Sequence, residues 1–153
     1  MIFLCRINEL GLSCFGCCGN NYSNKKKLIK DIKHNTKELG NLKSMRSFMA
    51  RFKGLRPSGI CANLVFKDGA FYCPGHPLLH QGRDYRDLDP DCSKDFVCKT
   101  YRLFQLWDEK KQQKFLDFLK AKNFDSFAYS IKMENNSILE EFEKNDMNSG
   151  ERI

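Results

Sequence analysis

The sequence predicts an α-rich α+β fold in which helices pack around one small β-hairpin. Three stretches repeat apolar side chains at the spacing of one helix face, and they lie in residues 24–52, 92–107 and 108–123. Two short runs of β-forming residues flank Asp68 and Gly69, a pair suited to the positive φ angles of a tight hairpin turn. Segments rich in Gly, Pro and Asp predict irregular connections between these elements.

The length is that of one ordinary domain, which we predict over residues 1–145, with a flexible acidic tail at 146–153. The start, MIFLCRINEL, has too short an apolar run before Cys5 and Arg6 for an export signal. No stretch approaches the roughly 18 consecutive apolar residues of a membrane span. We therefore expect a cytoplasmic protein, in a reducing compartment where grouped cysteines more often bind metal than each other.

The first cysteines lie in a predicted irregular segment, residues 5–18, which is followed by the turn-like GNNYSN. Ser23 or Asn24 is a candidate cap for the helix that follows. Gly40 and Asn41 interrupt its apolar pattern, which predicts two helices or a bend. The apolar residues of this stretch are Leu28, Ile32, Leu39, Leu42, Met45, Phe48 and Phe52.

A linker at residues 53–59, marked by Gly, Pro and Ser, leads to Cys61 and the predicted hairpin. Leu64–Phe66 and Ala70–Tyr72 are its strand-forming runs. Because the chain reverses between them, Cys61 and Cys73 should come close together at the open end of the hairpin.

Residues 74–91 lack any periodicity and predict a long loop, and a loop of that length is usually functional or held in place. The next helix is expected to open at Cys92 and Ser93 and to contain Cys98. Its apolar side is formed by Phe96, Val97, Thr100, Leu103, Phe104 and Trp107.

Asp108 is the predicted cap of a further helix that runs to residue 123. A last, short helix should begin at Ser137, where Ser137 and Glu140 have the spacing of a capping box. The residues of the Asp108 helix that are expected to face the core are Phe115, Leu116, Phe118 and Leu119.

Thiolates bind zinc and iron strongly, and four such ligands close a tetrahedral shell. Cys14-x-x-Cys17 has the two-residue gap of a zinc knuckle, and His76 follows Cys73 by three residues. We expect bound zinc to hold the irregular N-terminus and the central loop in place. We favour zinc over an iron–sulfur cluster because the sequence has neither the bacterial nor the plant-type cysteine spacing of ferredoxins. By sequence the cysteines form two sets of four, although ligands from both sets could mix. The candidate ligands are Cys5, Cys14, Cys17, Cys18, Cys61, Cys73, His76, Cys92 and Cys98.

A closed thiolate shell has no open position for water or substrate, so the pattern favours a structural or chelating metal over a catalytic one. An enzyme would need a site with three ligands and a vacancy, for which the surroundings of His76 are the best place.

Two stretches resemble the YkgJ-type cysteine-cluster family, a family of zinc- or iron-chelating domains: SCFGCCG at residues 13–19 and GICANLVFKDGAFYC at residues 59–73. The family's first cysteine falls on Gly11 in this chain, so Cys5 would have to stand in for it. The resemblance implies metal binding without a defined reaction. The matching residues are Cys14, Cys17, Cys18, Cys61, Leu64 and Cys73.

Three other uses of the cysteines compete with metal. A disulfide framework would suit the even cysteine count but needs an oxidising compartment. A lipid anchor would use Cys17 and Cys18 with the basic residues that follow, and leaves the later cysteines without a use. A catalytic thiol would need a nearby base, and the candidates are His34, His76 and His80.

The net charge of +7 is concentrated near the start of the chain, where residues 1–60 hold 12 basic and 3 acidic side chains. Such a segment is most often a solvated helix face, but it could also meet a phosphate backbone. The alternative function is therefore a zinc-stabilised RNA-binding module, in which Phe15, Tyr22 or Tyr85 could stack on bases. The lysines of that surface are Lys25, Lys26, Lys27, Lys30, Lys33 and Lys37.

Overall fold

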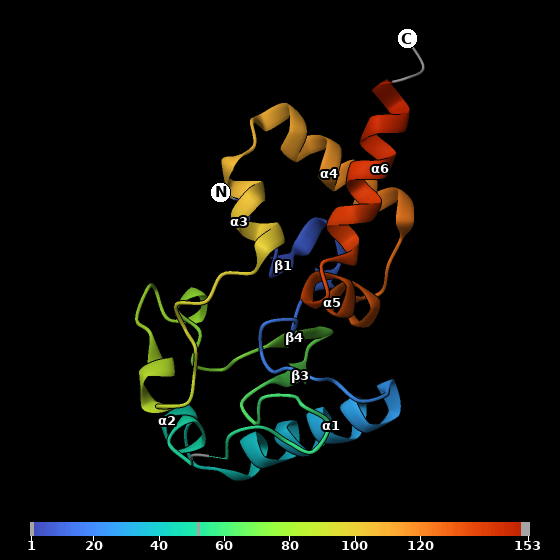
Figure 1. Ribbon diagram of the computed structural model, residues 1–153. Helices are drawn as coiled ribbons and strands as arrows, with labels where there is room; N and C mark the ends of the chain where they lie inside the picture. Colours follow the sequence, from blue (N-terminus) through green and yellow to red (C-terminus); the bar gives the residue numbers. More distant parts are fainter. Residues whose placement is uncertain (1, 52, 151–153) are drawn as a thin grey trace. The chain divides into compact units, whose positions relative to one another are not determined.

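The computed structural model describes residues 2–51 and 53–150, and the chain divides into two compact units (Figure 1). The described parts of Met1–Gly16 and Val97–Ile153 form the terminal unit, and those of Cys17–Phe96 form the central unit. The described residues contain six α-helices and two antiparallel hairpins, which confirms the predicted α-rich α+β fold. A single domain over residues 1–145 stays a prediction, because compact units need not fold independently.

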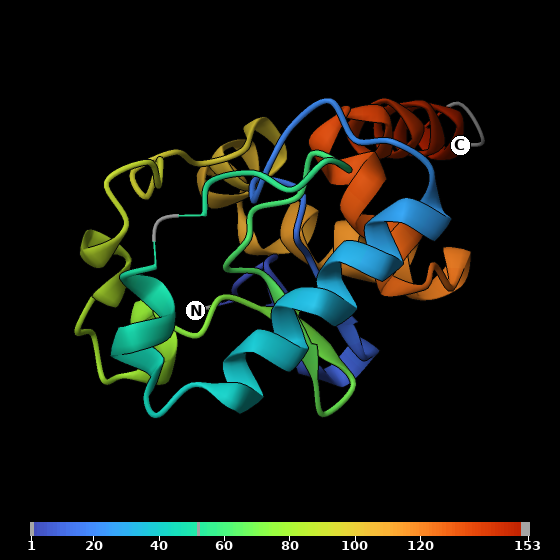
Figure 2. The same ribbon diagram turned by 90° about the horizontal axis from the view of Figure 1, so that it is seen from below.

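The central unit is built on a long helix, α1, that lies along one strand of a hairpin (Figure 2). A short second helix follows α1, and the hairpin pairs Val65 with Tyr72. The sequence predicted two helices or a bend and then a hairpin, and the structure has two helices and the hairpin, whereas Phe52 lies outside the described residues. The elements are α1 (Lys25–Asn41), α2 (Met45–Met49), β3 (Val65–Lys67) and β4 (Ala70–Tyr72), followed by the 3₁₀ helices η2 (Pro77–Leu79) and η3 (Tyr85–Leu88).

Local sequence explains why these elements begin and turn where they do. The Asn24 side chain accepts the N–H of Lys27 (2.9 Å) and so caps α1. The side chains of Leu28 and Ile32 are buried on one face of the helix. Asp68 and Gly69 have positive φ angles of 54° and 78°, as a tight two-residue hairpin turn requires.

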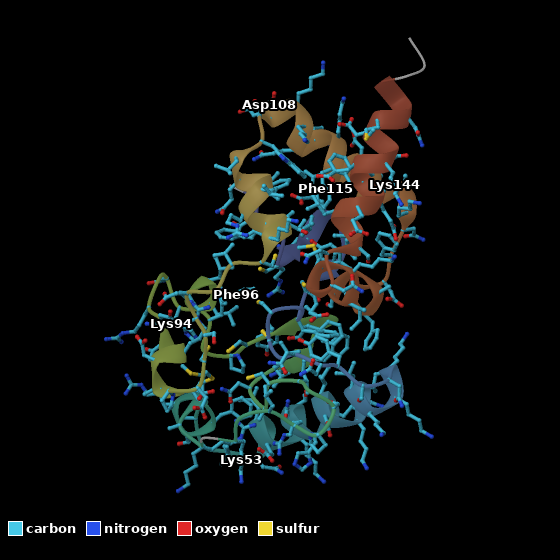
Figure 3. All side chains as sticks on the ribbon, in the orientation of Figure 1. Lys53, Lys94, Phe96, Asp108, Phe115 and Lys144 are labelled. Atoms are coloured by element: carbon cyan, nitrogen blue, oxygen red, sulfur yellow. The ribbon has the colours of Figure 1, made fainter. Side chains whose placement is uncertain are left out.

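The terminal unit packs four helices with a small hairpin, and its core is rich in aromatic side chains. Phe115 on α4 lies between the ribbons of α4 and α6 (Figure 3), where its ring meets that of Phe142 with centroids 5.1 Å apart. The elements are β1 (Arg6–Ile7), η1 (Asn8–Leu10), β2 (Leu12–Ser13), α3 (Lys99–Leu106), α4 (Glu109–Lys122), α5 (Ser126–Glu134) and α6 (Ser137–Gly150).

Helices α4 and α6 begin where the sequence predicts, and Asp108 caps α4 by accepting the N–H of Lys111 (2.8 Å). The sequence did not predict the β1–β2 hairpin or α5. Helix α6 extends to Gly150 and is therefore longer than expected. Asp125, which caps α5 by accepting the N–H of Ala128 (2.7 Å), was the local signal for the missed helix.

The predicted start of the third long helix at Cys92 was wrong, because α3 begins only at Lys99. Cys98 therefore lies not inside the helix but at its cap, where its Sγ accepts the N–H of Tyr101 (3.5 Å). Before it, the N–H groups of Cys92 and Phe96 are bonded in turns, to Asp89 O and Ser93 O. The Phe96 side chain is 60% exposed, so it does not continue a buried helix face.

Among the described residues, no helix combines the length and the apolar character needed to cross a bilayer.

Candidate metal centre

Five of the eight cysteines belong to the central unit, and we call them the central thiol group. Burial, together with the smaller effect of negative charge at Cys61 and Cys92, raises the pKa of the Cys73 thiol to about 12. Such effects require the sulfur atoms to lie near one another. None of the five is in a disulfide. The central thiol group consists of Cys17, Cys18, Cys61, Cys73 and Cys92.

The turn that carries Cys18 is paired with the turn that carries Cys61. The N–H of Cys61 donates to the carbonyl of Cys18 (2.7 Å), and the N–H of Asn20 donates to the carbonyl of Gly59 (3.1 Å). The two backbones approach so closely that a Cβ atom on Gly59 would lie 2.2 Å from Asn20 O. Gly59 also has a φ angle of +95°, a backbone conformation that residues with a side chain rarely adopt. Glycine at this position therefore brings Cys18 and Cys61 together.

Helix α1 also holds the Cys61 turn in place, through a buried asparagine. The Asn35 Nδ2 atom donates to the carbonyls of Cys61 (3.0 Å) and Leu64 (2.9 Å), while its Oδ1 accepts from Arg56 Nε (2.8 Å). Within the turn, the N–H of Asn63 donates to Cys61 Sγ (3.4 Å). A donor two residues after a cysteine stabilises its thiolate, as a metal ligand requires.

Asp89 connects the Cys61 turn to the segment of Cys92. Its Oδ2 accepts from Asn63 Nδ2 (2.8 Å), and its carbonyl accepts the N–H of Cys92 (3.1 Å). Its Oδ1 accepts the N–H of Asp91 (3.0 Å), and the side chain is almost fully buried. The carboxylate thus fixes the distance between two segments that are far apart in sequence.

Arg51, in the turn after α2, supports the same segment. Its Nη1 donates to Asn63 Oδ1 (2.7 Å) and to Phe48 O (3.0 Å), and its Nε donates to Glu38 Oε2 (2.6 Å). Although burial raises the pKa of Glu38, hydrogen bonds from Arg51 and Arg56 outweigh that effect and hold the pKa at about 2.

This depressed pKa makes the central unit sensitive to acid. Glu38 has an ordinary pKa of 4.5, so the stability that its ion pairs contribute is present above that pH and is lost as the pH falls towards 2. We expect Glu38→Gln to be less stable than the native chain at neutral pH, with a difference that shrinks between pH 4.5 and 2. Urea unfolding at several pH values measures this, and a difference independent of pH would contradict it.

Cys17 and Cys18 differ sharply in environment although they are adjacent. The Cys18 thiol donates a hydrogen bond to Cys17, and this bond, with a smaller contribution from the charge of Arg86, lowers the pKa of Cys17 to about 7 against the opposing effect of burial. The same hydrogen bond, followed by burial, raises the pKa of Cys18. By surface area the Cys17 residue is exposed, whereas Cys18 is half-buried.

His76 is the cap of η2, and its Nδ1 accepts the N–H of Leu78 (3.2 Å). A metal could therefore reach this ring only at Nε2. His80 is held differently: its Nε2 lies 2.6 Å from Pro74 O, and its ring packs edge-on against Tyr85. Both histidines are thus tied to their own loop.

The other three cysteines belong to the terminal unit and form the terminal thiol group, Cys5, Cys14 and Cys98. The N–H of Cys14 donates to the carbonyl of Cys5 (2.9 Å), next to the β1–β2 pairing. The N–H of Gly16 donates to Cys14 Sγ (3.2 Å), two residues along, as in a knuckle turn. Burial, followed by negative charge at the three thiols, raises the pKa of Tyr129 well above its ordinary value. All three sulfur atoms therefore lie near that ring.

The two groups in space differ from the two sets of four expected along the sequence. The boundary between the units falls between Gly16 and Cys17, so Cys14 and Cys17 of the predicted knuckle belong to different units. Within residues 2–51 and 53–150, no three His, Cys, Asp or Glu side chains have the arrangement of ligands around one metal ion.

All six predicted lysines of α1 are exposed. Lys30, Lys33 and Lys37 border a groove of about 420 Å³ on this helix. The groove also includes His34, which the sequence suggested only as a candidate base, and Arg56, which the sequence did not single out.

Comparison of the chain with protein-family models, with curated proteins and with solved structures gave no match.

Proposed function

We propose that the central unit is a metal-binding module in which the thiolates of Cys18, Cys61, Cys73 and Cys92 hold one zinc ion. The observation that carries this proposal is that unbridged thiols from four separate backbone segments influence one another's pKa. Folding would bring these sulfur atoms together at a cost, because buried thiols that share a small space repel one another once ionised. A bound cation would remove this repulsion between thiolates, and its binding free energy would then stabilise the folded state.

The hydrogen bonds around the sulfur atoms suit this role. The N–H of Asn63 bonds to Cys61 Sγ, and the N–H of Gly75 bonds to the Cys73 thiol. Arg86 adds positive charge near Cys73 and Cys92. These groups would stabilise thiolates and offset part of the negative charge of a four-sulfur site. Buried Asn35 and Asp89, which hold the ligand turns, would act as positioning residues.

Cys18 rather than Cys17 is the proposed ligand of the adjacent pair. Its carbonyl is bonded to the N–H of Cys61, whereas Cys17 is the exposed member. Both stretches that resemble the YkgJ-type family contribute to this group, through the Cys17–Cys18 pair and through Cys61. That resemblance supports a chelating or structural metal, and a shell of four thiolates would leave no open position for catalysis.

Metal content after single substitutions tests the proposal. We expect Cys61→Ser and Cys73→Ser each to lower the zinc content by about one ion per chain, because a hydroxyl does not replace a thiolate ligand. Cys98→Ser is a matched control, since serine can still cap α3 and the residue belongs to the terminal group. Protein should be purified without oxygen and analysed by mass spectrometry of the metals.

Two outcomes would refute the proposal. One is native protein without metal, with its thiols paired in disulfides or modified by lipid. The other is zinc that falls equally in Cys61→Ser and in Cys98→Ser, which would mean that binding is not specific to the central group. Iron in place of zinc would keep the site and change the ion.

A further inference from the structure

The exposed side of α1 carries an ordered row of positive charge. Lys26, Lys30, Lys33 and Lys37 follow one another at intervals of four, three and four residues, so they lie along one face of the helix. At 1.5 Å per residue the row is about 16 Å long. All four side chains are exposed. The last three lysines of this row border the groove described above, which we call the basic groove.

The rest of the basic groove adds charge that is held in place. Arg56 comes from the segment after α2, and its guanidinium donates to Asn35 Oδ1 and to Glu38 Oε1, both at 2.8 Å. These two bonds restrict the side chain, which is only 16% exposed. A fixed guanidinium loses little conformational freedom when it meets an anion, so it binds better than a mobile one. The residues that line the groove are Lys30, Asp31, Lys33, His34, Lys37, Arg56 and Pro57.

The acidic residues near the groove do not cancel this charge. The Glu38 carboxylate is paired with Arg51 and Arg56 and also lies 2.8 Å from His34 Nε2. Asp31 Oδ2 accepts the backbone N–H of Ser58 (3.0 Å), which ties that carboxylate to the loop. Three lysines and Arg56 against Asp31 leave the lining with a formal charge of +3 when His34 is neutral.

We propose that the basic groove binds the sugar–phosphate backbone of a nucleic acid. A row of lysines about 16 Å long spans several consecutive phosphates of an extended strand. The described lining of the groove contains no Phe, Tyr or Trp on which a base could stack, so we expect the contacts to be with phosphates and to depend little on base sequence. This inference does not depend on the metal.

A membrane surface fits the same helix less well. An amphipathic helix binds lipid through an exposed apolar face, and the Leu28 and Ile32 side chains of α1 are buried within the protein. Ile29, which is 36% exposed, does not by itself form such a face. Charge alone would then hold the helix to lipid, whereas the groove offers a nucleic acid both charge and shape.

Binding of fluorescent single-stranded RNA, double-stranded RNA and double-stranded DNA at several salt concentrations tests the proposal. We expect the native chain to bind at least one of them, with affinity falling steeply as salt rises. Lys30→Ala, Lys33→Ala and Lys37→Ala combined should weaken binding roughly tenfold or more and lower the salt dependence by about two to three counterions. Alanine favours helix, so α1 should persist, and circular dichroism and zinc content would verify this.

The matched control removes the same charge elsewhere, through Lys110→Ala, Lys114→Ala and Lys120→Ala combined on α4. It should retain binding within about twofold if the groove is the site. Equal weakening by both triple variants would overturn the proposal, because only net charge would then matter. It would also be overturned by failure of the native chain to bind any nucleic acid at low salt, or by stronger binding to vesicles of anionic lipid that the groove variant weakens.

Discussion

Gly59→Ala should lower the free energy of unfolding by about 3 kcal/mol or more and reduce the zinc content. An alanine Cβ at this position would lie 2.2 Å from Asn20 O, and the φ angle of +95° disfavours any side chain. The backbone would have to move apart, which would stretch the bond from Cys61 N–H to Cys18 O (2.7 Å). Urea unfolding followed by circular dichroism, with metal analysis of the same sample, measures both effects.

Gly40→Ala is the matched control for this variant. Gly40 lies in α1 with nothing within 4 Å of an added Cβ, so alanine there should stabilise the helix by about 0.5 kcal/mol and leave zinc unchanged. If Gly59→Ala were as stable as the native chain, the close pairing of the two turns would not exist in solution.

Arg51→Ala should destabilise the protein by about 3–5 kcal/mol, because it leaves several partly buried groups without their donor. The guanidinium bonds Glu38, Asn63 and the carbonyls of Phe48 and Ala62, and it stacks 3.7 Å from the centre of the Phe48 ring. The Arg51 side chain is only 11% exposed, so water cannot easily replace these bonds. Thermal and urea unfolding give the free-energy change.

Arg46→Ala removes an exposed arginine of the neighbouring helix α2, whose guanidinium lies 5.2 Å from the centre of the Tyr85 ring. We expect a loss below about 1 kcal/mol, the size of an exposed cation–π contact. Similar losses in the two arginine variants would mean that the network around Asn63 contributes nothing specific to the central unit.

The parts of the fold that the sequence predicted are those with strong local signals. Asp68 and Gly69 specify a hairpin turn by their own backbone preferences, and Asp108 specifies a helix start by its side-chain oxygen. The same reasoning failed at Cys92, where apolar residues suggested a helix. There the turn bonds to Asp89 O and Ser93 O decided the structure.

The candidate site was predictable in its ligand types but not in its grouping. Eight cysteines were visible in the sequence, whereas their division into five and three depends on which segments pack together. Asn35 looked like an ordinary polar position of a lysine-rich helix, and only the fold places it under Cys61 and Leu64. Asp89 likewise resembled one of several loop aspartates before it proved to link Asn63 to Cys92. Long-range hydrogen bonds of this kind leave no local signal in a single sequence.

X-ray absorption at the zinc edge, on native protein purified without oxygen, tests the central claim most directly, because it counts the atoms around the metal. We expect a shell of about four sulfur atoms near 2.3 Å. A shell made mainly of nitrogen and oxygen at about 2.0–2.1 Å would contradict the claim that the central thiols hold the ion.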